Sequence, residues 1–88
     1  MSVLDEAETI VNGPRAAVYG PPKVNLRRIA DLWSAYLERT VTAVDVCHLM
    51  ILLKVARSLG PTNTRDNLVD LVGYARLIEI IETGEPKE

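Results

Sequence analysis

The chain has 88 residues, a net charge of −2 at pH 7 and one cysteine, Cys47. This length predicts a single domain over 1–88, and one cysteine excludes an internal disulfide. An acidic balance argues against a DNA- or RNA-binding protein, because phosphate neutralisation needs a basic surface. The chain has no apolar run near the ~20 residues of a membrane span, and its acidic start is unlike a signal peptide, so we expect a cytoplasmic protein without membrane contact.

Two helices are predicted in the first half of the chain. Ser2 and Asp5 have the spacing of a capping box, and apolar residues at helical intervals follow, which predicts a helix over 3–11. Residues 12–25 contain the stretch GPRAAVYGPP, whose glycines and prolines predict a loop. Asn25 is expected to cap a second helix over 26–39.

Two further helices are predicted in the second half. Thr42 and Asp45 repeat the capping-box spacing, which predicts a helix over 43–59 that stops before Gly60 and Pro61. Its middle is apolar almost all round, so we expect it to be the central and most buried helix. A short turn leads to a helix over 65–83 and a polar tail over 84–88. No strand-like alternation is present, so the predicted class is an all-α domain of four helices.

Charged residues lie on one face of each of the last two predicted helices. A five-residue turn makes these helices an antiparallel hairpin, in which positions whose numbers sum to about 124 lie at equal height. Lys54 and Arg57 then face Asp66 and Asp70 across one seam. Two interpretations stay open at this point. The charges are structural ion pairs, or together with Tyr74 they form the polar floor of a small-molecule pocket.

Other residues are weaker candidates for a functional site. His48 has no second histidine or cysteine on its face, so no metal site is predicted, and Cys47 is interpreted as a buried structural thiol rather than a nucleophile. No catalytic residue is assigned. Gly73, inside a predicted helix, suggests the close approach of a backbone or a ligand. Arg15 and Tyr19 share the loop, which either packs on itself or covers the seam as a lid.

Three stretches, YGPPKVNLRRIADLWSAYL, TAVDVCHLMILLKVARSLG and RDNLVDLVGYARL, resemble a family of small tailed-bacteriophage proteins of unknown function. The resemblance runs from about Leu4 to Leu77 and implies expression in the cytoplasm of a bacterial host. The polar positions that match the family pattern form our predicted ligand-binding set: Arg15, Tyr19, Asn25, Lys54, Arg57, Arg65, Asp66, Asp70 and Tyr74.

A looser similarity is to the all-α nucleotide pyrophosphohydrolases of the MazG kind, through NLVDLVGYARL. Those enzymes hold Mg²⁺ with an ExxE motif and a later ExxD motif. Asp70 matches the last acid here, but Asn67 stands three residues before it and no suitable ExxE precedes it. Magnesium prefers several carboxylates together with substrate phosphates. The departure puts hydrolysis in doubt and leaves a nucleotide-sized pocket open.

Three functions are therefore in view. The leading one is a non-enzymatic protein without a cofactor that binds a small anionic ligand, a nucleotide, and sequesters a host defence signal. The second is a Mg²⁺-dependent pyrophosphohydrolase, and the third is a host-protein interaction module without a pocket. The apolar faces of the four predicted helices exceed what one small core needs, so we also expect a homo-oligomer.

Overall fold

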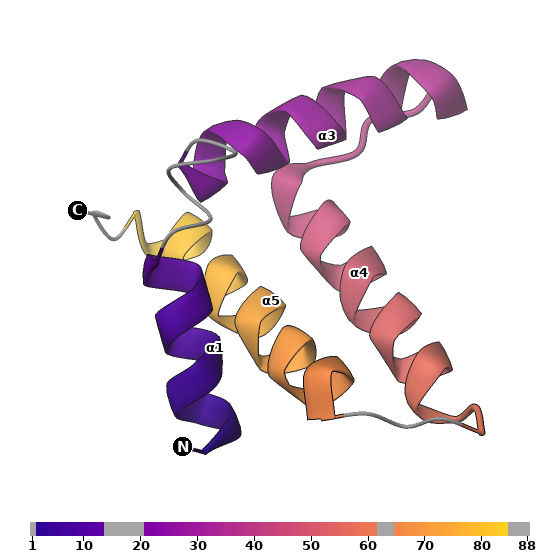
Figure 1. The fold of residues 1–88 in the computed structure, drawn as a ribbon. Helices are drawn as coiled ribbons and strands as arrows, with labels where there is room; N and C mark the ends of the chain where they lie inside the picture. Colours follow the sequence, from indigo (N-terminus) through magenta and orange to yellow (C-terminus); the bar gives the residue numbers. More distant parts are fainter. Residues whose placement is uncertain (1, 14–20, 62–64, 85–88) are drawn as a thin grey trace.

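The computed structural model describes residues 2–13, 21–61 and 65–84, and these ranges contain helices and no strand (Figure 1). The helices are α1 (Val3–Asn12), α3 (Pro22–Leu37), α4 (Ala43–Ser58) and α5 (Arg65–Thr83). The predicted all-α class is confirmed. None of the helices in the described ranges is both long enough and apolar enough to cross a membrane.

The helix α5 lies between α1 and α4 and packs against both, while α3 packs against α4 and crosses the end where α4 begins (Figure 1). The predicted hairpin of the last two helices is therefore confirmed. The expectation that the helix at 43–59 is the most buried one is wrong. Within α4, burial is confined to Val46, Cys47 and Lys54, and the opposite side of the helix faces solvent.

The start of α3 differs most from the sequence prediction. The helix begins at Pro22 rather than 26, because proline at the first helical position has a suitable fixed φ and lacks an N–H that would have no partner there. The backbone N–H of Asn25 donates to the carbonyl of Pro21 at 3.0 Å, so Asn25 lies inside the helix and is not its cap. The predicted loop over 12–25 is correspondingly shorter, and its residues 14–20 lie outside the described ranges.

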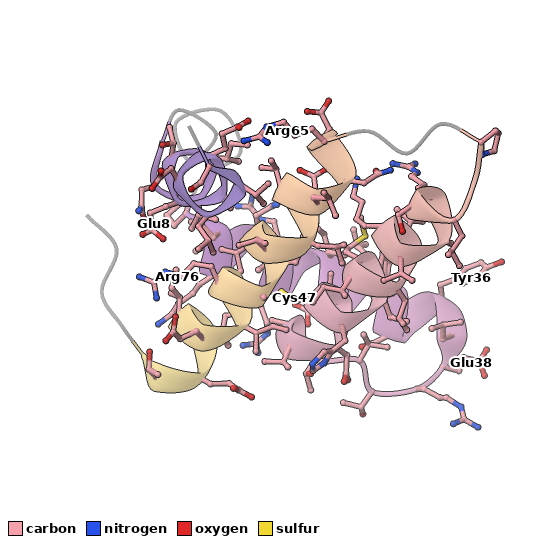
Figure 2. All side chains as sticks on the ribbon, turned by 90° about the horizontal axis from the view of Figure 1, so that it is seen from below. Glu8, Tyr36, Glu38, Cys47, Arg65 and Arg76 are labelled. Atoms are coloured by element: carbon pink, nitrogen blue, oxygen red, sulfur yellow. The ribbon has the colours of Figure 1, made fainter. Side chains whose placement is uncertain are left out.

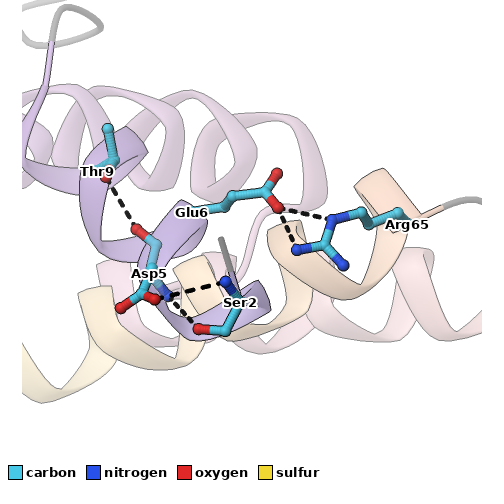
Figure 3. A network of polar contacts seen from close by, with 5 residues as sticks. All are labelled: Ser2, Asp5, Glu6, Thr9 and Arg65. Atoms are coloured by element: carbon cyan, nitrogen blue, oxygen red, sulfur yellow. Dashed lines mark hydrogen bonds and ion pairs between the residues drawn. The ribbon is translucent and has the colours of Figure 1, made fainter.

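Local hydrogen bonds fix the other helix ends. Both predicted capping boxes form, at Ser2 with Asp5 (Figure 3) and at Thr42 with Asp45. The helix α3 ends at Leu37 because Glu38 adopts a left-handed conformation, with φ of 54°. The connection to α4 is then held by Ser34. Its hydroxyl donates to the carbonyl of Val41 at 3.1 Å and accepts from the Val41 N–H at 2.8 Å.

The core forms where α3 and α4 meet the inner face of α5. Its fully buried cluster is Leu26, Ala30, Val46 and Cys47, with Trp33, Met50, Tyr74 and Leu77 among the partly buried residues around it. Ala7 and Val11 of α1 are buried as well. Each helix thus contributes one apolar stripe to a shared interior, as expected for packed amphipathic helices.

Candidate functional site

A cavity of about 190 Å³ lies among the four helices, beside the first half of α3. All four helices contribute to its wall, which is mostly apolar. The lining residues are Ala7, Ile10, Val11, Pro22, Asn25, Leu26, Ile29, Trp33, Val46, Met50, Val69, Asp70, Gly73, Tyr74 and Leu77. An apolar cavity with a few polar groups is the usual form of a small-molecule site.

Three polar side chains line this cavity: Asn25 of α3 and the pair Asp70 and Tyr74 of α5. Asp70 and Tyr74 share a face because they are four residues apart on one helix. The carboxylate of Asp70 accepts a 2.9 Å ion pair from the ammonium of Lys54, whose side chain is 11% exposed. The site therefore has one polar corner, in which a positive and a negative charge balance each other.

Gly73 forms part of the wall without any packing reason to be glycine. A Cβ atom added there would have Val11 Cγ2 as its nearest neighbour, at 3.8 Å, which is an ordinary van der Waals contact. Glycine inside a helix costs about 1 kcal/mol relative to alanine. The sequence suggested the close approach of a backbone or of a ligand at this position. No backbone of the described residues comes close, and the missing side chain leaves space within the cavity wall.

The predicted ligand-binding residues separate into three groups. Asn25, Asp70 and Tyr74 line the cavity, and Lys54 touches it through Asp70. Arg57, Arg65 and Asp66 do not line it. Arg15 and Tyr19 lie outside the described residues. The structure thus brings four of the nine predicted residues to one place.

Geometry explains why three of the predicted ligand-binding residues do not line the cavity. Arg65 lies five residues before Asp70, about 140° away around α5, and reaches α1, where its Nε donates to Glu6 at 2.6 Å (Figure 3). The predicted second pair of the seam, between Arg57 and Asp66, is not among the ion pairs of the described residues, and both residues are exposed. The seam consists of the Lys54–Asp70 pair.

Other titratable groups stand apart from the site. Burial raises the pKa of the Cys47 thiol to about 11, in line with its predicted structural role, and Figure 2 shows this residue in the interior. Arg76 of α5 contacts Glu8 of α1 at 3.4 Å (Figure 2) and Glu79 of its own helix at 2.7 Å. Among the described residues, no three His, Cys, Asp or Glu side chains are placed to hold a metal ion.

Sequence reasoning missed the apolar part of the site. Trp33 and Met50 form cavity wall, yet their spacing on α3 and α4 is the spacing of ordinary core residues. The spacing of the wall residues on α1 is equally that of core residues; these are Ala7, Ile10 and Val11. The one usable signal was Gly73, because a glycine in the middle of a helix needs an explanation.

The comparisons with known proteins find one family and two phage relatives. A family described as a domain of unknown function, DUF6378, matches residues 2–82. The Gene 55 protein of Mycobacterium phage D29 is 42% identical over 91 residues, covering 99% of this chain and 60% of that protein. The Gene 55 protein of Mycobacterium phage L5 is 47% identical over 87 residues, covering 97% of this chain and 55% of that protein. The chain spans little more than half the length of these relatives, and no solved structure matches it.

Proposed function

The chain belongs to the DUF6378 family and is similar to the Gene 55 proteins of two mycobacteriophages, and from this premise we propose that it is a non-enzymatic protein that binds a nucleotide by enclosing its base. The observation that carries the proposal is the apolar cavity whose wall also contains the polar side chains of Asn25, Asp70 and Tyr74. A flat heterocycle with apolar faces and a polar edge has the complementary chemistry.

The size of the cavity restricts what it encloses. Its volume of about 190 Å³ is somewhat larger than the ~150 Å³ cavity that takes up benzene. It is smaller than the roughly 300–1,000 Å³ pockets that enclose drug-sized ligands. The cavity therefore has room for a ring system, while the sugar and the phosphates of a nucleotide would remain outside it.

The polar side chains of the cavity wall offer the hydrogen-bonding groups that the edge of a base needs. An asparagine amide presents a donor and an acceptor side by side, the combination that pairs with the edge of adenine. The Asp70 carboxylate accepts hydrogen bonds from amino groups or ring N–H groups, and Lys54 holds it in place at 2.9 Å. Trp33 supplies an aromatic surface in the wall, and stacking on such a surface contributes about 1–3 kcal/mol per base.

The phosphates of a nucleotide need cations outside the cavity, and we assign this role to Arg57, a member of the ligand-binding set that the sequence predicts. It lies three residues after Lys54 on α4, is exposed, and takes part in no ion pair within the described ranges. Arg15 remains a predicted second contact. An arginine can hold a phosphate through two parallel hydrogen bonds. Nucleotides should therefore bind more tightly than the corresponding nucleosides.

Gly73 supports a binding role for the cavity. A helix that was under pressure for stability alone would gain from alanine here, because there is space for the methyl group. Positions that break a local rule without a packing reason are typical of functional sites. We interpret Gly73 as the residue that keeps the cavity open.

Membership of a phage family suggests what such binding would achieve. A protein that binds a nucleotide and returns it unchanged lowers the free concentration of that nucleotide. We therefore propose that the chain sequesters a signal nucleotide of the host defence. Support comes from the phage relatives and from a polar corner whose one carboxylate, that of Asp70, is neutralised by Lys54.

Trp33 makes the proposal directly testable, because it is the only tryptophan of the chain and lies in the cavity wall. Nucleosides and mono-, di-, tri- and cyclic nucleotides are titrated while the tryptophan fluorescence is recorded. We expect a saturable change with micromolar dissociation constants. Asn25→Ala and Gly73→Ala should weaken binding at least tenfold, and Arg57→Ala should weaken binding of nucleotides but not of nucleosides.

Arg28→Ala is the matched control, because Arg28 is an exposed arginine of α3 that does not line the cavity. Its affinities should equal those of the unchanged protein. The recovered ligand is then analysed by chromatography. Absence of any fluorescence change at millimolar ligand refutes base binding. Release of phosphate or pyrophosphate that needs Mg²⁺ and is lost in Asp70→Asn supports a hydrolase instead.

A further inference from the structure

The solvent side of α4 is an apolar stripe, formed by Leu49, Leu52, Leu53 and Ala56 and continued by Leu59 directly after the helix. Its residues recur at intervals of three and four, so they share one helix face. That face lies opposite the buried positions Cys47 and Lys54. All five are exposed, with values of 41% for Leu53 and 82% for Leu59, and no charged residue interrupts the stripe from 49 to 56.

A helix that is apolar on every side is normally buried on every side. The middle of α4 is apolar almost all round, but α5 and α3 cover only part of its circumference. Scattered surface leucines need no explanation. A continuous row of exposed leucines along one helix needs an explanation, because contiguous apolar patches mark interaction sites.

The size of the molecule gives a second, independent observation. Its accessible surface is 6036 Å², about 900 Å² more than the roughly 5,100 Å² expected of a compact monomer of this mass. The radius of gyration of 13.4 Å likewise exceeds the roughly 12 Å expected for 88 residues. One partner of a standard protein interface buries about 800 Å². The excess is similar in size to the area that one partner of such an interface buries.

We propose that a second copy of this chain covers the stripe, with the two α4 helices packed antiparallel about a twofold axis. A twofold interface requires a surface that is complementary to itself, and the stripe meets this requirement. With the axis between Leu52 and Leu53, each Leu52 lies against Leu53 of the second copy. Each Leu49 then lies against the small Ala56, so large and small side chains alternate across the contact.

Charge at the ends of the stripe favours the same arrangement. Asp45 lies near the start of α4 and Arg57 near its end. An antiparallel pairing brings the acidic end of one helix toward the basic end of the other, and it opposes the two helix dipoles. A parallel pairing would place like charges together. Complementary ends set orientation and register more than affinity.

The first test measures mass by sedimentation velocity at 10 and 100 µM. We expect about 19 kDa, twice the 9.7 kDa of one chain. Leu52→Glu should raise the dissociation constant of the dimer at least 100-fold, because it buries a charge in an apolar contact. Leu4→Glu is the matched control, because Leu4 is 69% exposed on α1, away from the stripe, and should leave the mass unchanged.

The second test locates the contact. Leu52→Cys is treated with a bifunctional maleimide, and a covalent dimer is expected, whereas Leu4→Cys should give none. The native Cys47 is fully buried and does not compete. Circular dichroism confirms that each variant is helical. A monomer at 100 µM overturns the proposal, as does a dimer that Leu52→Glu leaves intact.

Discussion

Lys54 is the residue whose setting most depends on tertiary structure. Its side chain is buried on an otherwise apolar part of α4, and Asp70 supplies its counter-charge from the neighbouring helix. Hairpin geometry predicted this contact from the sequence. It could not predict that the pair borders a cavity, because the cavity depends on how far α1 and α3 stand from α5.

Substitutions can distinguish the two interpretations of the Lys54–Asp70 pair, a structural ion pair or part of a ligand-binding site. Asp70→Leu leaves the Lys54 ammonium without its partner, and it should therefore lower the unfolding free energy by about 2 kcal/mol. This loss is smaller than the roughly 3–5 kcal/mol expected for a fully buried pair. Adding Lys54→Met should restore most of the loss, since an apolar pair of similar volume avoids desolvation. Urea denaturation measures both values.

Nucleotide affinity in the double variant then decides the role of the pair. If Lys54→Met with Asp70→Leu is stable but binds no nucleotide, the charges belong to the site. Unchanged affinity in that variant would show that the pair is structural. Arg27→Met with Asp31→Leu is the matched control, because that ion pair spans 3.5 Å on the exposed side of α3.

At the scale of the element, helix ends with side-chain caps were predictable and the start of α3 was not. The helix at 43–59 ends one residue earlier than predicted, at Ser58, and the helix at 65–83 was correct. Thr42 and Asp45 fix the start of α4 through bonds that involve only neighbouring residues. A proline pair is compatible with a loop or with the first turn of a helix, and only packing decides between the two.

The end of α3 offers a prediction at this scale. Glu38 has φ of 54°, a left-handed conformation that glycine adopts without steric cost. Glu38→Gly should therefore raise the unfolding free energy by about 0.5–1 kcal/mol, and Glu38→Val should lower it. Thermal unfolding followed by circular dichroism gives both values. Equal losses in the two variants would contradict the argument.

At the scale of the whole molecule, the sequence predicted the class and the hairpin but not which helix is central. An apolar surplus on the helix at 43–59 fits either a core position or an interface position, because both remove the same surface from water. The structure assigns the centre to α5. For the same reason, Trp33 and Met50 could not be recognised as cavity wall from their spacing.

Cys47 reports on unfolding of the whole domain. Burial raises its pKa from an ordinary 9.0 to about 11, so at pH 8 the folded thiol is ionised about 100-fold less than the unfolded one. A thiol-reactive dye should label it only through unfolding. Labelling at the rate of a free thiol in the native protein would contradict this expectation.

The raised pKa of Cys47 makes the stability of the folded state depend on pH. The folded state keeps the Cys47 proton more firmly than the unfolded state, so its stabilising effect is complete below pH 9. Stability should then fall as the pH rises from 9 to about 11. Cys47→Ala should show a shallower decline over this interval in urea titrations, because the remaining slope comes from other groups.

The central place of α5 also sets an order of events during translation. The segment α1 is complete at Asn12, but α5, the helix it packs against, is complete only at Thr83. At about 5–20 residues per second, the ribosome needs roughly 4–14 s to add the intervening chain. A ten-residue helix is too short to be stable alone in water. The nascent chain therefore stays without its core until α5 has been made.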